Sequence, residues 1–306
     1  MKPLLSVVVS AYNEEASLSR CLTSVKKIAD EIVVVDNSSR DKTVQIAKRF
    51  TKKVYTRPNL LMLNTNKNFG FSKATGKWIL NLDADEEVTP ELANEILTII
   101  NQNDGSSREL PAGYWINRKT IIFGKWIRHG LWWPDRQLRL FANGKGIFAC
   151  ENIHEYVSVD GITPELMHPM NHYNYSTVAQ YLQKIDRCTT SEALVLKDTG
   201  YAIKWWDALR FPLSDFTKIY FAEHAYRDGL HGLVLALFQA FYSFVTFTKA
   251  WEMHGFADIP FTDDDVANEL TRGAKEVRYW MRTQMIEQTN DPTKKLWGRF
   301  VRKIDR

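Results

Sequence analysis

Two aspartates, Asp83 and Asp85, follow an apolar run, residues 77–82, and have one residue between them. Carboxylates this close repel each other, and a bound divalent cation relieves the repulsion. Mg²⁺ or Mn²⁺ held by one or two carboxylates completes its shell with water and phosphate oxygens, so such a site can neutralise a diphosphate. The alternative is an acidic helix start, because Asp85 opens an acidic stretch and acids suit helix N-termini.

The elements around this pair alternate between β-branched runs and helical patterns over the first hundred residues. This alternation predicts βαβ units and a parallel sheet. Strands are expected at residues 4–10, 31–35 and 77–82, and helices at residues 16–28, 41–50 and 90–100. Ligands of open α/β sheets bind beyond the carboxyl ends of the strands. Asp36 ends the second strand and Glu14 follows the first, so the cation interpretation is favoured over the helix start.

The turn after the first strand excludes one class of nucleotide-binding enzyme. A nicotinamide dehydrogenase requires a glycine-rich turn there, which lets the backbone approach a pyrophosphate. Residues 10–15 contain no glycine and carry two acids. A nucleotidyltransferase should have a glycine-rich phosphate loop with a basic residue near the N-terminus, and none is visible in the sequence.

The composition is that of a globular protein of 306 residues, with 44% hydrophobic residues, 25% charged residues and a net charge of +4. Cys21, Cys150 and Cys188 are odd in number and widely separated, which predicts neither a disulfide framework nor a zinc site. The apolar run at residues 4–9 is too short for the core of a signal peptide. We therefore expect a cytoplasmic protein without a nucleic-acid partner, and a homo-oligomer stays open.

Two late segments bear on membranes. Residues 231–251 approach a spanning length, but polar side chains dilute them, so we expect a buried or membrane-surface helix rather than a span. The tail, residues 294–303, holds five cations and no acid, which suits either an anionic surface or a solvated helix end. A peripheral location at the inner face of the cytoplasmic membrane is thus left open.

Several segments together resemble glycosyltransferase family 2, whose members have the GT-A fold. The resemblance lies in residues 7–15, 31–43, 66–70 and 74–86. More narrowly, the chain is similar to the bacterial lipopolysaccharide-core β-glucosyltransferase-like branch through residues 132–141, 153–155, 172–175 and the end of the late apolar segment at residues 249–252. The likeness extends to about Glu252 and fades beyond it.

The resemblance implies roles for the residues at the strand ends. Those implied to bind the donor nucleotide and the metal are Ala11, Tyr12 and Glu14 in the nucleotide pocket, Asp36 at the base or ribose, Asn68 near the diphosphate, Asp83 at the ribose or metal, and Asp85 as main metal ligand. A tyrosine ring offers a face for a pyrimidine, although Tyr12 could equally be a packed aromatic. His172 could return to the metal as a third ligand, donate to the diphosphate, or be structural.

An inverting transfer also needs a carboxylate, distinct from the metal ligands, that takes the proton of the acceptor hydroxyl. The family commonly carries it in a Glu-Asp pair, which is absent here. Asp135 follows aromatic residues that could form the floor of a sugar site and raise its pKa, while Glu155 lies in a polar turn. Asp135 is favoured narrowly over Glu155. Either could instead be a salt-bridge partner of Arg128, Arg136 or Arg139.

These observations predict a GT-A α/β fold with a mostly parallel sheet flanked by helices. The catalytic domain is expected at residues 1–176, with a nucleotide-sugar half at 1–100 and an acceptor half at 101–176, followed by a helical extension at 177–306. The expected reaction is metal-dependent transfer of a hexose from a nucleotide diphosphate sugar, UDP being favoured, to a glycan or lipid-linked acceptor such as lipopolysaccharide core. The alternatives are a peptide acceptor, a nucleotidyltransferase, and a non-catalytic binding protein on the same fold.

Overall fold

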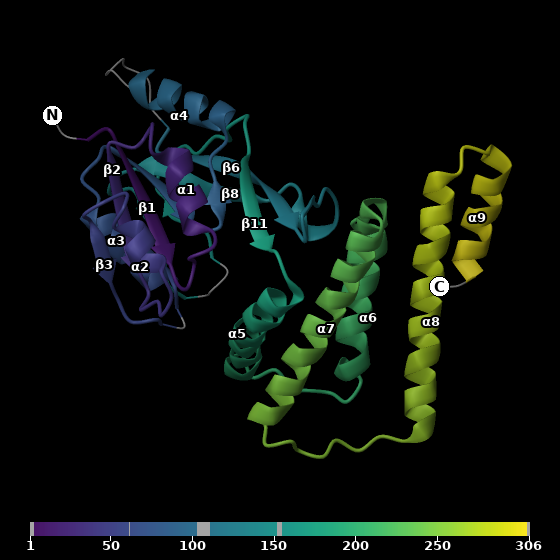
Figure 1. Ribbon diagram of the computed structural model, residues 1–306. Helices are drawn as coiled ribbons and strands as arrows, with labels where there is room; N and C mark the ends of the chain where they lie inside the picture. The colour runs from purple at the N-terminus through teal and green to yellow at the C-terminus, as the bar shows by residue number, and fades with distance from the viewer. Residues whose placement is uncertain (1–2, 61, 103–110, 152–154, 305–306) are drawn as a thin grey trace. The chain divides into compact units, whose positions relative to one another are not determined.

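The computed structural model describes residues 3–60, 62–102, 111–151 and 155–304, and it divides into two compact units (Figure 1). The first unit consists of Met1–Trp126 and Trp133–Ser176 and contains the sheet. The second consists of Ile127–Trp132 and Thr177–Arg306 and is helical. Residues 127–132 thus lie with the helices, whereas the sequence prediction placed them in the catalytic domain.

The sheet of the first unit begins with four parallel strands. In spatial order they are β3 (Val54–Thr56), β2 (Glu31–Asp36), β1 (Leu5–Ala11) and β4 (Trp78–Asp83). The register sets Ala11 opposite Asp36 and Ser10 opposite Asp83. The carboxyl ends of the three predicted strands therefore meet at one edge, as the sequence indicated.

The remaining strands make the sheet mixed rather than mostly parallel. In spatial order they are β8 (Arg136–Ala142), β6 (Gly113–Ile122), β11 (Met170–Tyr175) and β5 (Glu86–Glu87), with β7 (Lys125–Trp126) beside β6. β8 pairs antiparallel with both β4 and β6, and β11 runs parallel to β6. A separate hairpin-like pair joins β9 (Gly146–Ile147) to β10 (Ser158–Val159).

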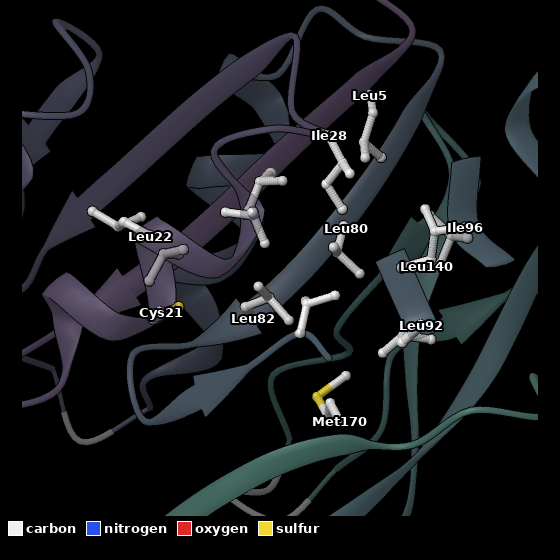
Figure 2. Packing of buried hydrophobic residues seen from close by; sticks show 14 of the residues in the cluster. Leu5, Cys21, Leu22, Ile28, Leu80, Leu82, Leu92, Ile96, Leu140 and Met170 are labelled. Atoms are coloured by element: carbon white, nitrogen blue, oxygen red, sulfur yellow. The ribbon is translucent and has the colours of Figure 1, made fainter. Parts of the chain in front are cut away.

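Helices cover both faces of this sheet. One face packs on α1 (Leu18–Val25) and α4 (Pro90–Gln102), with α2 (Thr43–Ala47) contributing Ala47. Figure 2 shows Leu22, Leu82, Leu92 and other side chains of this core packed together. The opposite face packs on α3 (Asn64–Lys73). A Cβ atom on Gly70 would come within 2.6 Å of Val8 Cγ1, so the glycine allows α3 to lie close against β1.

The second unit is built from helices. They are η1 (Gly130–Trp132), α5 (Val178–Asp198), α6 (Asp207–Thr217), the π-helix η2 (Lys218–Ala222), η3 (Ala225–Asp228), α7 (Leu230–Met253), α8 (Asp263–Gln288) and α9 (Pro292–Ile304). Within the described residues, α7 is the helix whose length and hydropathy would allow it to cross a membrane, and 28% of its most apolar window is buried. Tyr181 of α5 stacks on Phe238 of α7 with ring centroids 4.2 Å apart.

A buried carboxylate at the start of β2, that of Glu31, predicts how stability depends on pH. Burial alone would raise the pKa of Glu31, but the Lys53 ammonium and hydrogen bonds from Ser6 and Thr75 outweigh it and lower that pKa to about 2. A lowered folded-state pKa stabilises the fold fully above the unfolded value near 4.5, and the contribution is lost as pH falls towards 2. In urea titrations, the free energy of unfolding of wild type should fall by about 3 kcal/mol as pH falls through this window. We expect no such loss in Glu31→Gln. Parallel pH profiles for the two proteins would contradict this.

Candidate functional site

The loops after β1 and β2 form the first wall of the candidate site, and hydrogen bonds tie them together. Asn13 N–H donates to Ser39 Oγ over 2.9 Å, and Arg40 N–H donates to the Asn13 side chain over 2.8 Å. Ala11 and Asp36 are buried, whereas Tyr12 exposes 36% of its surface at this edge. The ring of Tyr12 is therefore accessible to a ligand.

Glu14 takes part in starting α1. Its backbone carbonyl accepts from Leu18 N–H over 2.9 Å, and its carboxylate accepts a short hydrogen bond from the Ser17 hydroxyl. Its own N–H donates to Thr43 Oγ1 over 2.7 Å. Glu14 thus fixes the loop that carries Tyr12, and its contact with a nucleotide stays a prediction.

Asp83, at the end of β4, lies in a cluster of three cations and three carboxylates that we call the ion cluster. Its members are Lys67, Arg118 and Arg139 together with Asp83, Glu86 and Asp135. Lys67 Nζ lies 2.6 Å from Asp83 Oδ1, and Arg139 forms a short ion pair with the other oxygen. Burial alone would raise the pKa of Asp83, but the charges of Arg139 and Lys67 outweigh it and hold that pKa well below its usual value.

Glu86 is the buried centre of the ion cluster. Its Oε1 accepts from Arg118 over 3.1 Å and from Arg139 over 2.6 Å, and its Oε2 accepts from Asp83 N–H over 2.9 Å. A carboxylate buried without cations would be costly, so these two arginines and Glu86 hold each other in place. They thereby fix the turn that follows Asp83.

Asp85 and His172 are brought together by strand pairing. β11 pairs antiparallel with β5, which sets His172 opposite Glu86, and Tyr173 N–H donates to the Asp85 carbonyl over 2.9 Å. His172 Nε2 lies 3.5 Å from Asp85 Oδ2, and its Nδ1 lies 3.3 Å from Thr120 Oγ1. A strand distant in sequence therefore delivers the histidine to the aspartate predicted to bind metal.

The side chains around Asp85 can be tested for their fit to a divalent cation. Across the described ranges, no group of three or more His, Cys, Asp or Glu side chains is arranged to hold a metal. Asp83 is turned to Lys67 and Arg139, which leaves Asp85 and His172 as adjacent protein donors. Mg²⁺ and Mn²⁺ sites that bind substrate phosphates commonly use few protein donors and complete the shell with phosphate and water, so this pair fits such a cation.

Asn68, expected near the diphosphate, makes two hydrogen bonds with the backbone of Phe148. Its Nδ2 donates to the Phe148 carbonyl over 2.9 Å, and its Oδ1 accepts from the Phe148 N–H over 3.0 Å. Asn68 therefore bridges α3 to the segment before Cys150. The neighbouring Lys67 is the α3 side chain that reaches the end of β4.

The two candidate bases lie in different surroundings. Asp135 Oδ2 is 2.9 Å from Arg118 Nε and 2.7 Å from its Nη2, and Asp135 Oδ1 accepts from Gln137 over 3.0 Å. These partners are polar, unlike the aromatic floor suggested by the sequence, and Trp133 packs edge-to-face on Trp126 instead.

Glu155 accepts hydrogen bonds from two nearby backbone N–H groups and from an α3 side chain. Its Oε1 accepts from Cys150 N–H over 2.7 Å and from Asn64 Nδ2 over 3.0 Å, and its Oε2 accepts from Glu151 N–H over 3.2 Å. Ile153 and His154, which belong to the same sequence motif, lie outside the described residues. Asp135 belongs to the ion cluster through its ion pair with Arg118.

Sequence reasoning missed Lys67, Arg118 and Glu86 as members of the site. Lys67 lay within the Asn-Lys-Asn-Phe-Gly segment and Glu86 directly follows Asp85, so both had a local signal. Arg118 sits in the middle of β6, where its sequence neighbours say nothing about the strands beside it. Arg139, which the sequence offered as a salt-bridge partner of Asp135 or Glu155, is instead buried against Asp83 and Glu86.

This fold and site define an α/β glycosyltransferase with the GT-A fold, and the comparisons with known proteins agree. Residues 6–122 match the sequence model of glycosyl transferase family 2. By this match, residues 6–122 of the chain belong to glycosyltransferase family 2.

The relatives are similar over most of their length. The lipopolysaccharide core biosynthesis glycosyltransferase LpsC of Rhizobium meliloti is 25% identical over 272 residues, which cover 86% of this chain and 98% of that protein. An uncharacterized glycosyltransferase of Rickettsia typhi is 28% identical over 267 residues, covering 81% of this chain and 87% of the relative. Among solved structures, S. aureus TarS matches with a TM-score of 0.43 and 14% identity, covering 85% of this chain and 94% of that one.

Proposed function

We propose that this glycosyltransferase transfers a hexose, with inversion, from a UDP-sugar to a hydroxyl of a glycan or lipid-linked acceptor of the lipopolysaccharide-core type. The observation that carries the proposal is the meeting of Asp36, Asp83 and the Asp85–His172 pair at the carboxyl edge of the sheet. Ligands of such sheets bind at that edge. The similarity to LpsC over nearly its whole length supports the acceptor class.

The donor site is proposed to divide its work among these residues. The accessible ring of Tyr12 supplies a face for the uracil, and Asp36 accepts from the base or ribose. Asp85 and His172 would hold a divalent cation, which supplies positive charge to the departing diphosphate. Lys67, whose Nζ lies 2.6 Å from Asp83 Oδ1, would add a second positive charge beside the diphosphate.

The transfer step is proposed to use Asp135 as the base. The acceptor oxygen attacks the anomeric carbon as its proton passes to the Asp135 carboxylate, a new carbon–oxygen bond forms, and the bond to the diphosphate breaks, releasing UDP. Arg118 contacts Asp135 and Glu86, and its Nη1 lies 3.8 Å from Asp83 Oδ2. It therefore lies between the proposed base, Asp135, and the Asp83 carboxylate. We place the reaction in the cytoplasm, which suits the three free cysteines.

A ligand screen tests the donor proposal. Because a ligand that binds only the folded state raises its melting temperature by mass action, UDP with Mn²⁺ should raise the melting temperature. At a ligand concentration about a hundredfold above Kd, the melting temperature should rise by several degrees. GDP, dTDP and CMP, each with and without Mn²⁺, are the matched controls. If none of the nucleotides shifts the melting temperature, the proposal is contradicted. A larger shift with GDP than with UDP would indicate a purine-nucleotide donor.

A further inference from the structure

The last helix, α9, leaves an apolar strip uncovered. Leu296, Trp297 and Phe300, which we call the apolar strip, expose 71%, 68% and 59% of their surface, and the rings of Trp297 and Phe300 stack with centroids 5.9 Å apart. In a soluble protein, adjacent exposed aromatics on one helix commonly mark a contact surface. The strip is therefore a candidate docking surface.

Gly298, Val301 and Arg302 of α9 contact α8. A Cβ atom on Gly298 would come within 2.7 Å of Ile286 Cγ1, and Arg282 Nη1 donates to the Val301 carbonyl over 2.7 Å. Arg302 donates to Thr283 Oγ1 over 3.2 Å. These contacts anchor α9 on α8 through Gly298, Val301 and Arg302, so Leu296 and Phe300 are not needed for the packing of the hairpin.

Charge indicates what would cover the strip. Residues 292–304 contain five cations and no acid, and Lys294 and Arg299 are exposed. The groove between α8 and α9 has a volume of about 580 Å³. It also combines cationic and apolar side chains, among them Arg282, Lys294, Met285 and Trp297. A basic helix with Trp, Phe and Leu on its apolar side has the composition of a helix that lies in a membrane interface.

We propose that α9 binds the surface of a bilayer rich in anionic lipid, with the apolar strip inserted among the acyl chains and the cations at the headgroups. Anionic headgroups attract juxtamembrane cations, and the aromatic rings contribute the apolar area. This inference is independent of the donor site. It assigns membrane contact to α9 rather than to α7.

α7 lacks this charge pattern. It also exposes apolar residues, Leu237 and Phe241 among them. Its only lysine, Lys249, is engaged with α5, because Nζ donates to Asp186 Oδ1 and to Thr190 Oγ1, each over 2.7 Å. An anionic surface would therefore gain little electrostatic attraction from α7, which makes an α7 variant a matched control.

Vesicle sedimentation of the full chain tests the proposal. Wild type should bind phosphatidylcholine vesicles that contain phosphatidylglycerol, bind pure phosphatidylcholine weakly, and lose affinity as salt is raised. Leu296→Ser with Phe300→Ser should weaken binding by about tenfold or more, and Arg299→Glu by about fivefold or more. Leu237→Ser with Phe241→Ser should bind like wild type.

The outcomes separate this proposal from the proposed function. Unchanged binding by the α9 variants, equal binding to both vesicle types, or a loss confined to the α7 variant would overturn it. Circular dichroism and the melting-temperature shift with UDP and Mn²⁺ check that the α9 variants are folded and that their donor site is intact. Loss of that shift in wild type would count against the donor proposal while leaving the vesicle result to stand.

Discussion

Replacing Asp85 by asparagine is expected to reduce glycosyl transfer by at least about a hundredfold, because the site then loses the negative charge that favours a divalent cation. Asparagine keeps the size of the side chain, and the Asp85 carbonyl can still accept from Tyr173 N–H. The fold should therefore survive. The measurement is transfer at saturating donor with a series of Mn²⁺ concentrations, together with the melting-temperature shift produced by UDP and Mn²⁺.

Glu87→Gln is the matched control for this variant. Glu87 lies two residues further on, in β5, and its carboxylate accepts from Asn171 Nδ2 over 3.0 Å and from Tyr173 Oη over 2.8 Å. It is a nearby acid whose hydrogen bonds go to Asn171 and Tyr173. Activity close to wild type is expected for Glu87→Gln. Mn²⁺-dependent transfer that survives intact in Asp85→Asn would show that the cation is held elsewhere.

The parallel part of the site was predictable because its information is local. β1, β2 and β4 are largely apolar runs. β2 and β4 end in an aspartate and polar residues follow β1, and parallel strands bring their carboxyl ends to one edge. The register then sets Ala11 opposite Asp36 and Ser10 opposite Asp83. No knowledge of distant contacts was needed for this.

The ion cluster was not predictable because its members meet through non-local pairing. Arg118 and Arg139 come from β6 and β8, and only the sheet order brings both to Glu86. The proximity of His172 to Asp85 likewise depends on the pairing of β11 with β5. A charge in a strand looks like a solvated surface residue until the neighbouring strands are known.

α3 escaped prediction for a different physical reason. Its sequence, residues 64–73, contains three asparagines and a glycine, which are poor helix formers. The helix is instead held by tertiary contacts, because Asn66 donates to Asn37 Oδ1 over 2.6 Å and Gly70 lies close against Val8. Tertiary packing thus overrides weak propensity, and Lys67 is placed at Asp83 as a result.

Replacing Asp135 by asparagine should lower kcat by about 10²- to 10⁴-fold while donor binding is retained, because a neutral amide cannot accept the acceptor's proton. The asparagine oxygen can still accept from Arg118, and the Gln137 amide can rotate to accept from the new NH₂ group. The position of the side chain should therefore be preserved. The measurement is kcat and KM for transfer, with the melting-temperature shift by UDP and Mn²⁺ as the test of donor binding.

Glu155→Gln distinguishes the two candidate bases. The Glu155 carboxylate accepts hydrogen bonds from the Cys150 and Glu151 N–H groups, so its amide variant should lower stability by weakening these bonds and change kcat much less than Asp135→Asn. The reverse pattern, in which Glu155→Gln abolishes transfer and Asp135→Asn does not, would assign the base to Glu155. Asp135 would then be an ion-pair partner that positions Arg118, since Arg118 Nη1 lies 3.1 Å from Glu86 Oε1 and connects Asp135 to the end of β4.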